Sequence, residues 1–116
     1  MGLFNKVMSK QDSDIEEFLN TIDEEPEENY EDADAFVKPM DLISEADATA
    51  AIKEAKSGNI VLLNIDDLSK RNSVKLKELV ARIKQEIKLI DGDLARISQE
   101  RILVTPSKVK IIKKRQ

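Results

Sequence analysis

The sequence predicts an α/β fold: a small mixed β-sheet with two crossover helices, in the order β-α-β-α-β-β-β, behind a charged N-terminal arm. Two observations support this fold class. Apolar runs of strand length alternate with segments of helical periodicity from residue 36 onward, and short strand-like segments separated by turn residues follow. This region contains a single aromatic residue, Phe36, so aliphatic side chains must supply its buried surface. A core of about 80 residues is small but large enough to fold alone.

Charge divides the chain into regions of different character. Residues 1–35 contain two lysines and twelve acidic residues, whereas residues 36–116 contain seventeen basic and eleven acidic residues. All twelve acids of the first part fall within residues 12–35, where there is no basic residue; this composition is typical of a solvated, extended segment. We therefore expect an amphipathic membrane-binding helix at residues 1–11, a disordered acidic linker at residues 12–35 and a folded core at residues 36–116.

Apolar residues near the N-terminus recur at the i, i+3, i+4 and i+7 spacing of a helix, and lysines occupy the opposite face. This pattern is typical of a helix that lies in the interface of an anionic membrane. A frayed terminus is the alternative. The residues expected to bind the membrane are Leu3, Phe4, Lys6, Val7, Met8 and Lys10. A second amphipathic segment, Ser13 to Ile22, has an acidic polar face, and it is either a protein-docking helix or a transient helix.

The first half of the core predicts a strand, a helix and a second strand. Phe36–Ile43 alternates like a strand, and Pro39 places it at a sheet edge or a bulge. A cap at Ser44 begins an alanine-rich helix, which Gly58 ends. Ile60–Ile65 is a continuous apolar run, as expected of a strand that is buried on both faces.

The second half of the core predicts one helix and several short strands. Asp66-Asp67 is expected to be a linker to a helix that presents Leu76, Leu79, Val80 and Ile83 on one side. The strands that follow are expected at Ile87–Ile90, Asp93–Ser98 and Arg101–Thr105, where Pro106 ends the last of them, with a final strand at Val109–Ile112.

Two helices are too few to cover both faces of the expected sheet. Ile60–Leu63 and Ile102–Val104 are apolar on both faces, and right-handed crossovers can place both helices on the same face. We therefore expect a homodimer, in which a second subunit covers the other face. The alternative is that residues 106–116 fold back over it.

Composition excludes several classes of site. Without Cys or His, the chain cannot form disulfides or Ser-His and Cys-His catalytic centres, and nearly all zinc sites are excluded. The carboxylate clusters Asp66-Asp67 and Asp91-Gly92-Asp93 are explained better by turn geometry than by a metal or acid–base site. The basic residues lack the aromatic platform of a nucleic-acid site. We expect no enzyme activity, no cofactor and no nucleic acid.

Three functions agree with these exclusions: a tethering adaptor, a nucleic-acid-binding module, and a small regulatory α/β domain with an acidic disordered tail. The sequence contains neither a signal peptide nor a run of about 20 apolar residues. We therefore expect a cytoplasmic protein that is at most peripheral on a membrane.

Two motifs stand out in the last part of the core: Gly92-Asp93-Leu94-Ala95-Arg96-Ile97 and Ile102-Leu103-Val104-Thr105-Pro106. In order and spacing they resemble the SepF family, whose members tether the division tubulin FtsZ to the membrane. The resemblance extends over residues 36–112 and includes the N-terminal tip and the acidic linker. Bacterial members usually have Gly-Gly-Asp where this chain has Asp91-Gly92-Asp93, Gly in place of Ser98 and often Phe in place of Ile102. These differences resemble the archaeal branch.

The resemblance implies a non-enzymatic cell division adaptor. Its tip would lie on the inner face of the cell membrane at the division site, and its dimeric core would bind the C-terminal tail of FtsZ. The paired glycines support a polymer-forming contact in bacterial relatives, so a dimer is expected here rather than a ring. Such tails combine apolar residues with acids and Lys or Arg, which suits a groove with aliphatic walls and basic edges. The expected partner-binding residues are Arg96, Ile97, Arg101, Ile102 and Leu103, although Ile97, Ile102 and Leu103 also fit a simple core role.

Overall fold

The computed structural model describes residues 14–22 and 30–113, and the chain divides into two units, residues 1–33 and residues 34–116. In the first unit, residues 14–22 are helical. The apolar side chains of this helix are exposed, Phe18 the most at 65%. A short 3-10 helix, η1, follows at Tyr30–Asp32. The residues expected to bind the membrane lie outside the described residues, and the disorder of the acidic linker stays a prediction.

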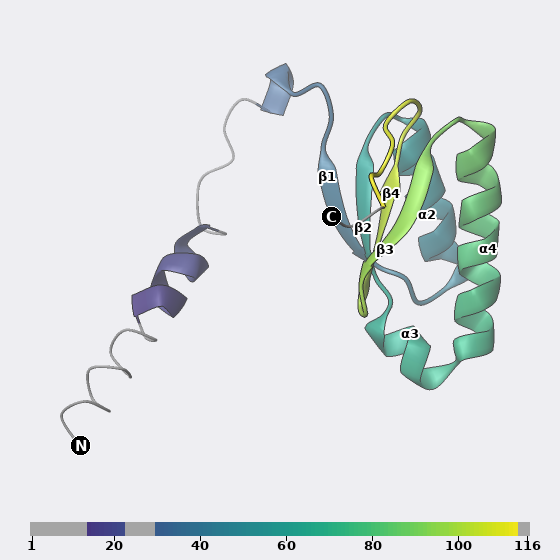
Figure 1. Cartoon of the computed structure of the whole chain (residues 1–116), viewed down its shortest axis with the longest axis horizontal. Coiled ribbons are helices and arrows are strands. Elements are labelled where there is room, and N and C mark those ends of the chain that lie inside the picture. Colours follow the sequence, from purple (N-terminus) through teal and green to yellow (C-terminus); the bar gives the residue numbers. More distant parts are fainter. Residues whose placement is uncertain (1–13, 23–29, 114–116) are drawn as a thin grey trace. The chain divides into compact units, whose positions relative to one another are not determined.

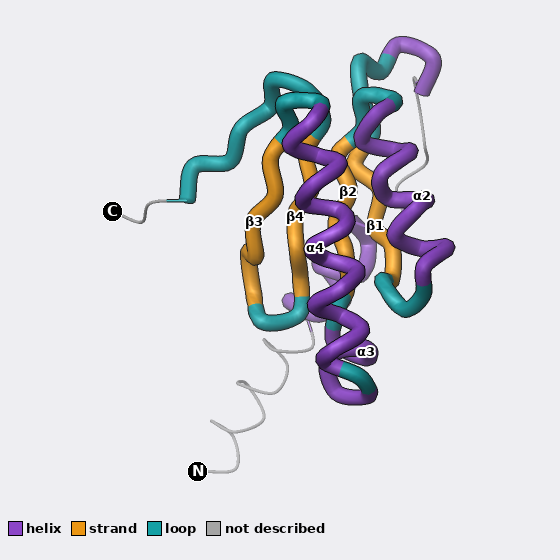
Figure 2. The backbone as a smooth tube through the Cα atoms, turned by 90° about the vertical axis from the view of Figure 1, so that its right-hand side faces the viewer, coloured by secondary structure: helices purple, strands orange, loops and turns teal. Residues whose placement is uncertain are grey.

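The second unit is a mixed α/β domain, as the sequence predicts. Its elements are β1 (Val37–Asp41), α2 (Glu45–Lys56), β2 (Ile60–Asn64), α3 (Asp66–Arg71), α4 (Ser73–Leu89), β3 (Asp93–Ser98) and β4 (Arg101–Thr105). The strands form one sheet in the order β1-β2-β4-β3. The β1–β2 pair is parallel, and β4 is antiparallel to both β2 and β3. Helices α2 and α4 lie side by side on one face of this sheet (Figures 1 and 2).

The signals at both ends of helix α2 act as the sequence predicts. The backbone N–H of Ser44 donates to Asp47 Oδ2 at 3.0 Å, and the backbone N–H of Asp47 donates to Ser44 O at 3.1 Å. Gly58, just past the other end, has φ +94°, a left-handed conformation that glycine adopts without a steric cost. Asn59 then connects the helix to the sheet, because its Oδ1 accepts from the Phe36 N–H and its Nδ2 donates to Glu54.

The predicted strand at Ile87–Ile90 is wrong, because these residues continue helix α4 and its C-cap. The helix ends in a Schellman motif: the Gly92 N–H donates to Ile87 O at 2.9 Å and the Asp91 N–H donates to Lys88 O at 3.1 Å. Asp91 has the positive φ of 61° that this motif requires. Apolar residues that recur every three or four positions from Leu76 to Ile87 are the signal for the longer helix.

Two further sequence predictions need correction. Asp66-Asp67 is not a linker but the first turn of helix α3, where the two carboxylates pair with Lys70 and Arg71 one turn later. Val109–Ile112 forms no strand, since its backbone bonds to Pro106, to the Asp93 carboxylate and to the Thr105 hydroxyl instead of to a neighbouring strand. Residues 34–113 therefore have the order β-α-β-α-α-β-β.

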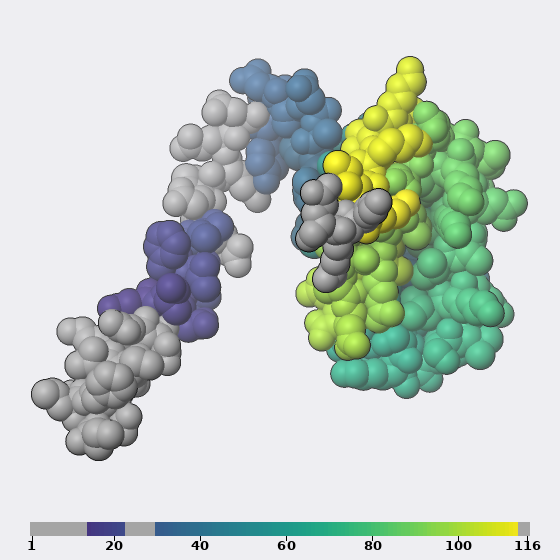
Figure 3. Space-filling view, viewed as in Figure 1, coloured from purple at the N-terminus to yellow at the C-terminus, as the bar shows by residue number. Residues whose placement is uncertain are grey.

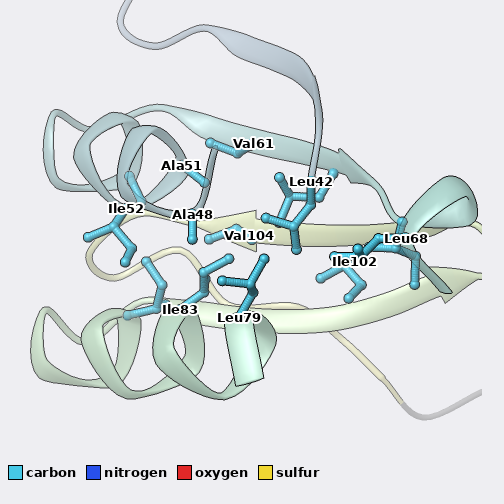
Figure 4. Packing of buried hydrophobic residues seen from close by; sticks show 14 residues of the cluster. Leu42, Ala48, Ala51, Ile52, Val61, Leu68, Leu79, Ile83, Ile102 and Val104 are labelled. Atoms are coloured by element: carbon cyan, nitrogen blue, oxygen red, sulfur yellow. The ribbon is translucent and has the colours of Figure 1, made fainter. Parts of the chain in front are cut away.

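The core lies between the sheet and the two long helices. Val61, Leu63, Ile102 and Val104 are buried, and because Val61 pairs with Val104 and Leu63 with Ile102, all four point to the face that the helices cover. Figure 4 shows α2 and α4 side chains packed against them. Deleting one such side chain in a core of this kind typically costs about 2–5 kcal/mol of stability. The helix side of the cluster is made by Ala48, Ala51, Ile52, Ala55, Leu79, Ile83 and Ile87.

Strand β1 is an edge of the sheet, as Pro39 predicts. The Ile60 N–H donates to Phe36 O and the Leu42 N–H donates to Asn64 O, so even-numbered residues of this strand direct their backbone groups toward β2. Since successive residues alternate, Pro39 faces the open edge. Its missing N–H removes a hydrogen-bond donor from the middle of that edge, which protects it from pairing with another strand.

The sheet face away from the helices, called here the outer face, carries an apolar row. Register pairs Pro39 with Leu62, Leu62 with Leu103, and Leu103 with Ala95, so the row crosses all four strands. Leu62, Leu103 and Ala95 are half-buried and Pro39 is exposed. Val37, on the same face, is 63% exposed. The outer face therefore presents apolar surface that the described residues leave partly open.

Candidate functional site

A groove of about 720 Å³ lies between the last turns of α4 and strand β3. Three parts of the chain form its walls. Helix α4 contributes Lys84, Ile87 and Lys88, strand β3 contributes Asp93, Leu94, Ala95 and Arg96, and the segment after β4 contributes Lys110 and Lys113, with Asp91 and Gly92 at the turn. We call this site the α4–β3 groove.

The turn between α4 and β3 determines the shape of the groove. The Schellman motif places Gly92 directly against the end of β4, where a Cβ atom would overlap the carbonyl oxygen of Thr105 and lie 2.9 Å from Ile87 Cγ2. Only glycine allows this approach. The close contact sets β3 beside α4 with room between them for an apolar floor, formed by Ile87 and Leu94. Ala95 also lines the groove at the edge strand, but its side chain belongs to the outer face.

Cations of two kinds border the α4–β3 groove. Lys110 and Lys113 are paired, with Nζ 2.7 Å from Asp91 Oδ1 and 2.6 Å from Asp93 Oδ1 respectively. The other three are Lys84, Lys88 and Arg96, which have no carboxylate partner among residues 14–22 and 30–113. Within these residues, Arg96 donates only to the backbone oxygens of Ser98 and Gln99. An apolar floor beside unneutralised cations suits a ligand that has both apolar and acidic side chains.

The two aspartates have lowered pKa values. The hydrogen bond from Lys113 is the largest cause for Asp93, followed by the backbone N–H of Ile111, and together they lower its pKa to about 2. The hydrogen bond and charge of Lys110 lower the pKa of Asp91. Both carboxylates are therefore charged at neutral pH and hold the segment after β4.

The stability of the domain should depend on Asp93 in acid. Because its pKa is lowered by folding from 3.8 to about 2, its contribution is complete above pH 4 and disappears as the pH falls toward 2. We expect the free energy of unfolding of the wild type to decrease as the pH falls through this window, and that of Asp93→Asn to decrease less, because it lacks the contribution of Asp93. Urea titrations of both proteins between pH 2 and pH 5 measure these free energies. Parallel curves for the two proteins would contradict the prediction.

The structure separates the five partner-binding residues expected from the sequence. Arg96 lines the α4–β3 groove, and its strand partner Ile102 is buried beneath it, with 5% of its surface exposed. Ile97 lies at the register shift of β3 and is 47% exposed. Leu103 and Arg101 belong to the outer face, where Arg101 lines a shallow pocket with Pro39, Leu62 and others.

Other groove residues were not expected from the sequence. Lys84 and Lys88 stand four positions apart, which places them on one side of a helix. The predicted strand at Ile87–Ile90 hid this spacing, because it ended the helix before Lys88. Lys110 and Lys113 join them only through the chain reversal after Thr105, for which the sequence offers Pro106 as the one local signal.

The described parts of the chain show neither a metal site nor a membrane-spanning helix. In residues 14–22 and 30–113, no group of three or more carboxylates is arranged to hold a metal ion. No helix of these residues is both long and apolar enough to cross a bilayer.

Comparison with known proteins identifies the family. The family model described as Cell division protein SepF matches residues 37–111. An uncharacterized protein from Methanocaldococcus jannaschii is 28% identical over 99 residues, which are 85% of this chain and 66% of that protein. The chain thus spans slightly less than two thirds of this relative's length.

Solved structures show the same fold. A SepF-like protein from Pyrococcus furiosus is similar with a TM-score of 0.61 and 27% identity, over 76% of this chain and 99% of that one. A SepF-like protein from Archaeoglobus fulgidus has a TM-score of 0.64 and 17% identity, over 70% and 96%. The cell division protein SepF from Methanobrevibacter smithii, solved in complex with FtsZ-CTD, has a TM-score of 0.54 and 16% identity, over 68% and 99%. Since the family model matches most of its length, this chain belongs to the SepF family of cell division proteins.

Proposed function

We propose that this protein is a cell division adaptor that binds the C-terminal tail of FtsZ and tethers it to the inner face of the cell membrane. Family membership supports the role in cell division. The Methanobrevibacter smithii relative, which has the same fold, is solved with FtsZ-CTD bound. The observation that supports binding in this chain is the α4–β3 groove, whose apolar floor lies beside three cations that have no carboxylate partner in the part of the chain that the structure describes.

The chemistry of the groove matches that of such a tail. Apolar side chains of the tail would cover Leu94, and its acids would approach Lys84, Lys88 and Arg96. Burial of one large apolar side chain contributes about 1.5–3 kcal/mol, and complementary charge accelerates encounter and selects against basic peptides.

Charge reversal at Arg96 tests the site. Arg96→Glu should weaken binding of an FtsZ tail peptide by on the order of 1–3 kcal/mol, because it replaces an attractive charge with a repulsive one. Arg101→Glu makes the same change in net charge on the outer face and should weaken binding much less. Fluorescence anisotropy with a labelled peptide from the source organism's FtsZ measures both affinities. Equal losses in the two variants, or a larger loss for Arg101→Glu, would place the tail outside the groove.

We also propose that the protein acts as a homodimer through the outer face. The apolar row from Pro39 to Ala95 crosses the whole sheet, and residues 106–113 bond near the ends of β3 and β4 rather than across that row. A second copy of the same face offers a matching apolar surface around a two-fold axis. Two subunits would double the number of N-terminal tips and of tail sites in one assembly.

Membrane binding is assigned to residues 1–11, with Leu3, Phe4, Lys6, Val7, Met8 and Lys10 as the contact residues. Phe4→Asp places a charge among the apolar side chains and should abolish sedimentation with anionic liposomes. Asn5→Asp adds the same charge on the polar side and should reduce sedimentation far less. Full sedimentation of the Phe4→Asp chain would contradict tethering by this segment, and it would leave tail binding by the groove unaffected.

A further inference from the structure

The chain after β4 turns back along the end of strand β3. The Lys108 N–H donates to Asp91 O at 2.9 Å, and the Ile111 N–H donates to Asp93 Oδ2 at 2.8 Å. The buried hydroxyl of Thr105 accepts from the Asp93 N–H at 2.9 Å and donates to Val109 O. In the space-filling view this segment, in yellow, lies against the surface of the core beside the light-green residues of the α4–β3 region (Figure 3). We call residues 106–113 the C-terminal strap.

The strap provides the third wall of the α4–β3 groove. Its Lys110 and Lys113 line the groove together with residues of α4 and β3. Asp91 and Asp93 hold the ammonium groups of these two lysines, and the aliphatic stem of a lysine held in this way can cover apolar surface. Because Lys110 and Lys113 are each paired with an aspartate, these two lysines add shape to the groove but little net charge.

The two aspartates hold the strap in different ways. The Asp93 carboxylate accepts from the strap backbone at Ile111, from the Lys113 side chain at 2.6 Å, and from its own strand at Leu94 N–H. Within the described residues, the Asp91 carboxylate bonds only the Lys110 side chain, while the backbone oxygen of Asp91 accepts from the Lys108 N–H and from Lys110 Nζ. Loss of the Asp91 carboxylate therefore leaves every backbone bond of the strap in place, whereas loss of the Asp93 carboxylate frees Ile111.

We propose that the C-terminal strap is a binding wall for the acidic, apolar tail peptide, and that Asp93 is the positioning residue that holds this wall against the groove. The inference rests on the proposed function for the identity of the peptide. Asp93 itself lines the groove, and we assign its effect on binding to the placement of Lys110, Ile111 and Lys113.

Two substitutions with the same change in charge distinguish this proposal from simple electrostatics. Asp91→Asn and Asp93→Ala each raise the net charge by one, so charge alone predicts that both bind the acidic tail more tightly. If the strap is a wall, Asp91→Asn should tighten binding by a factor of about three, since it frees the charge of Lys110 in an intact groove. Asp93→Ala should weaken binding about tenfold, since the wall is lost. Anisotropy of the labelled FtsZ tail peptide with the full chain measures both.

A second pair of variants tests the strap without any change in charge. Ile111→Pro removes the backbone N–H that bonds Asp93, and it should weaken peptide binding by a factor similar to that of Asp93→Ala. Ile112→Pro is the matched control, because the side chain of Ile112 is 92% exposed and its N–H makes no hydrogen bond within the described residues. It should bind like the wild type. Thermal melts of all four variants show whether the core remains folded.

Hydrogen exchange supplies a measurement that needs no ligand. The Ile111 amide should be protected in the wild type and in Asp91→Asn, and should exchange rapidly in Asp93→Ala. Protection in Asp93→Ala, or tighter binding by both aspartate variants, would overturn the proposal. A wild-type chain that ignores the peptide would overturn the proposed function itself. If the wild type binds the peptide and Ile111→Pro binds it equally well, only the proposal that the strap is a binding wall would be overturned.

Discussion

Gly92→Ala should destabilise the domain by about 3 kcal/mol or more, which is the upper part of the range for steric overpacking. The new methyl group would overlap the backbone oxygen of Thr105, lie 2.9 Å from Ile87 Cγ2 and lie 3.3 Å from the Pro106 oxygen. Since two of these atoms belong to the backbone, a rotamer change cannot relieve the overlap. The start of β3 must move away from β4, and the α4–β3 groove must change shape with it. Denaturant midpoints followed by circular dichroism measure the loss.

Gly58→Ala is the matched control for this substitution. A methyl group at Gly58 meets no atom within 4 Å, but the residue has φ +94°. The change should therefore cost only the conformational penalty, about 1–2 kcal/mol, and it should leave binding of the tail peptide unchanged. If Gly92→Ala has the denaturant midpoint and the peptide affinity of the wild type, the turn accommodates a larger side chain than the structure allows.

Leu62→Glu should convert the proposed homodimer to a monomer. Leu62 lies in the apolar row of the outer face, between Pro39 of β1 and Leu103 of β4. If two outer faces pack together, the new carboxylate is removed from water in the middle of the apolar row. Burying a charge costs several kcal/mol even beside a cation such as Arg101, which lines the same pocket as Leu62. The folded monomer should survive, because the side chain is only half-buried in a single chain. Multi-angle light scattering on the full chain across a range of concentrations measures the change.

Leu89→Glu controls for the effect of added charge. Leu89 is 76% exposed at the end of α4, away from the outer face, so this variant should remain dimeric. A wild-type chain that is monomeric at tens of micromolar would contradict the homodimer. A Leu62→Glu chain that stays dimeric would show instead that the subunits meet through another surface, such as the exposed sides of the helices.

Many of the elements could be predicted because their signals are local. The Ser44 cap and the Gly58 stop define helix α2 within a few residues, and the run from Ile60 has the length and composition of a strand. The error at Ile87–Ile90 has a local cause as well. Four apolar or basic residues before an Asp-Gly pair fit either a short strand or a last helical turn, and the helical periodicity from Leu76 is what decides between them.

The candidate site was predictable only in part. The motif that begins at Gly92 directed attention to the right strand, and Arg96 does line the groove. Ile102 and Leu103 are adjacent in sequence, but they lie on opposite faces of the sheet, so they cannot serve one surface together. The cations Lys84 and Lys88 gave no sign of belonging with Arg96, because nothing in a sequence states which side of a helix faces which strand.

The sequence by itself determined the division into a charged N-terminal arm and an aliphatic α/β core, because composition and periodicity are properties of the chain alone. It also determined the membership of the SepF family, through residues 37–111. Only the tertiary structure decided which face of the sheet the helices cover and where the groove lies. Those features depend on the pairing of β4 between β2 and β3 and on the return of residues 106–113 to Asp93. Each of these contacts joins residues far apart in the chain, where the balance of packing and hydrogen bonding, rather than local propensity, selects the arrangement.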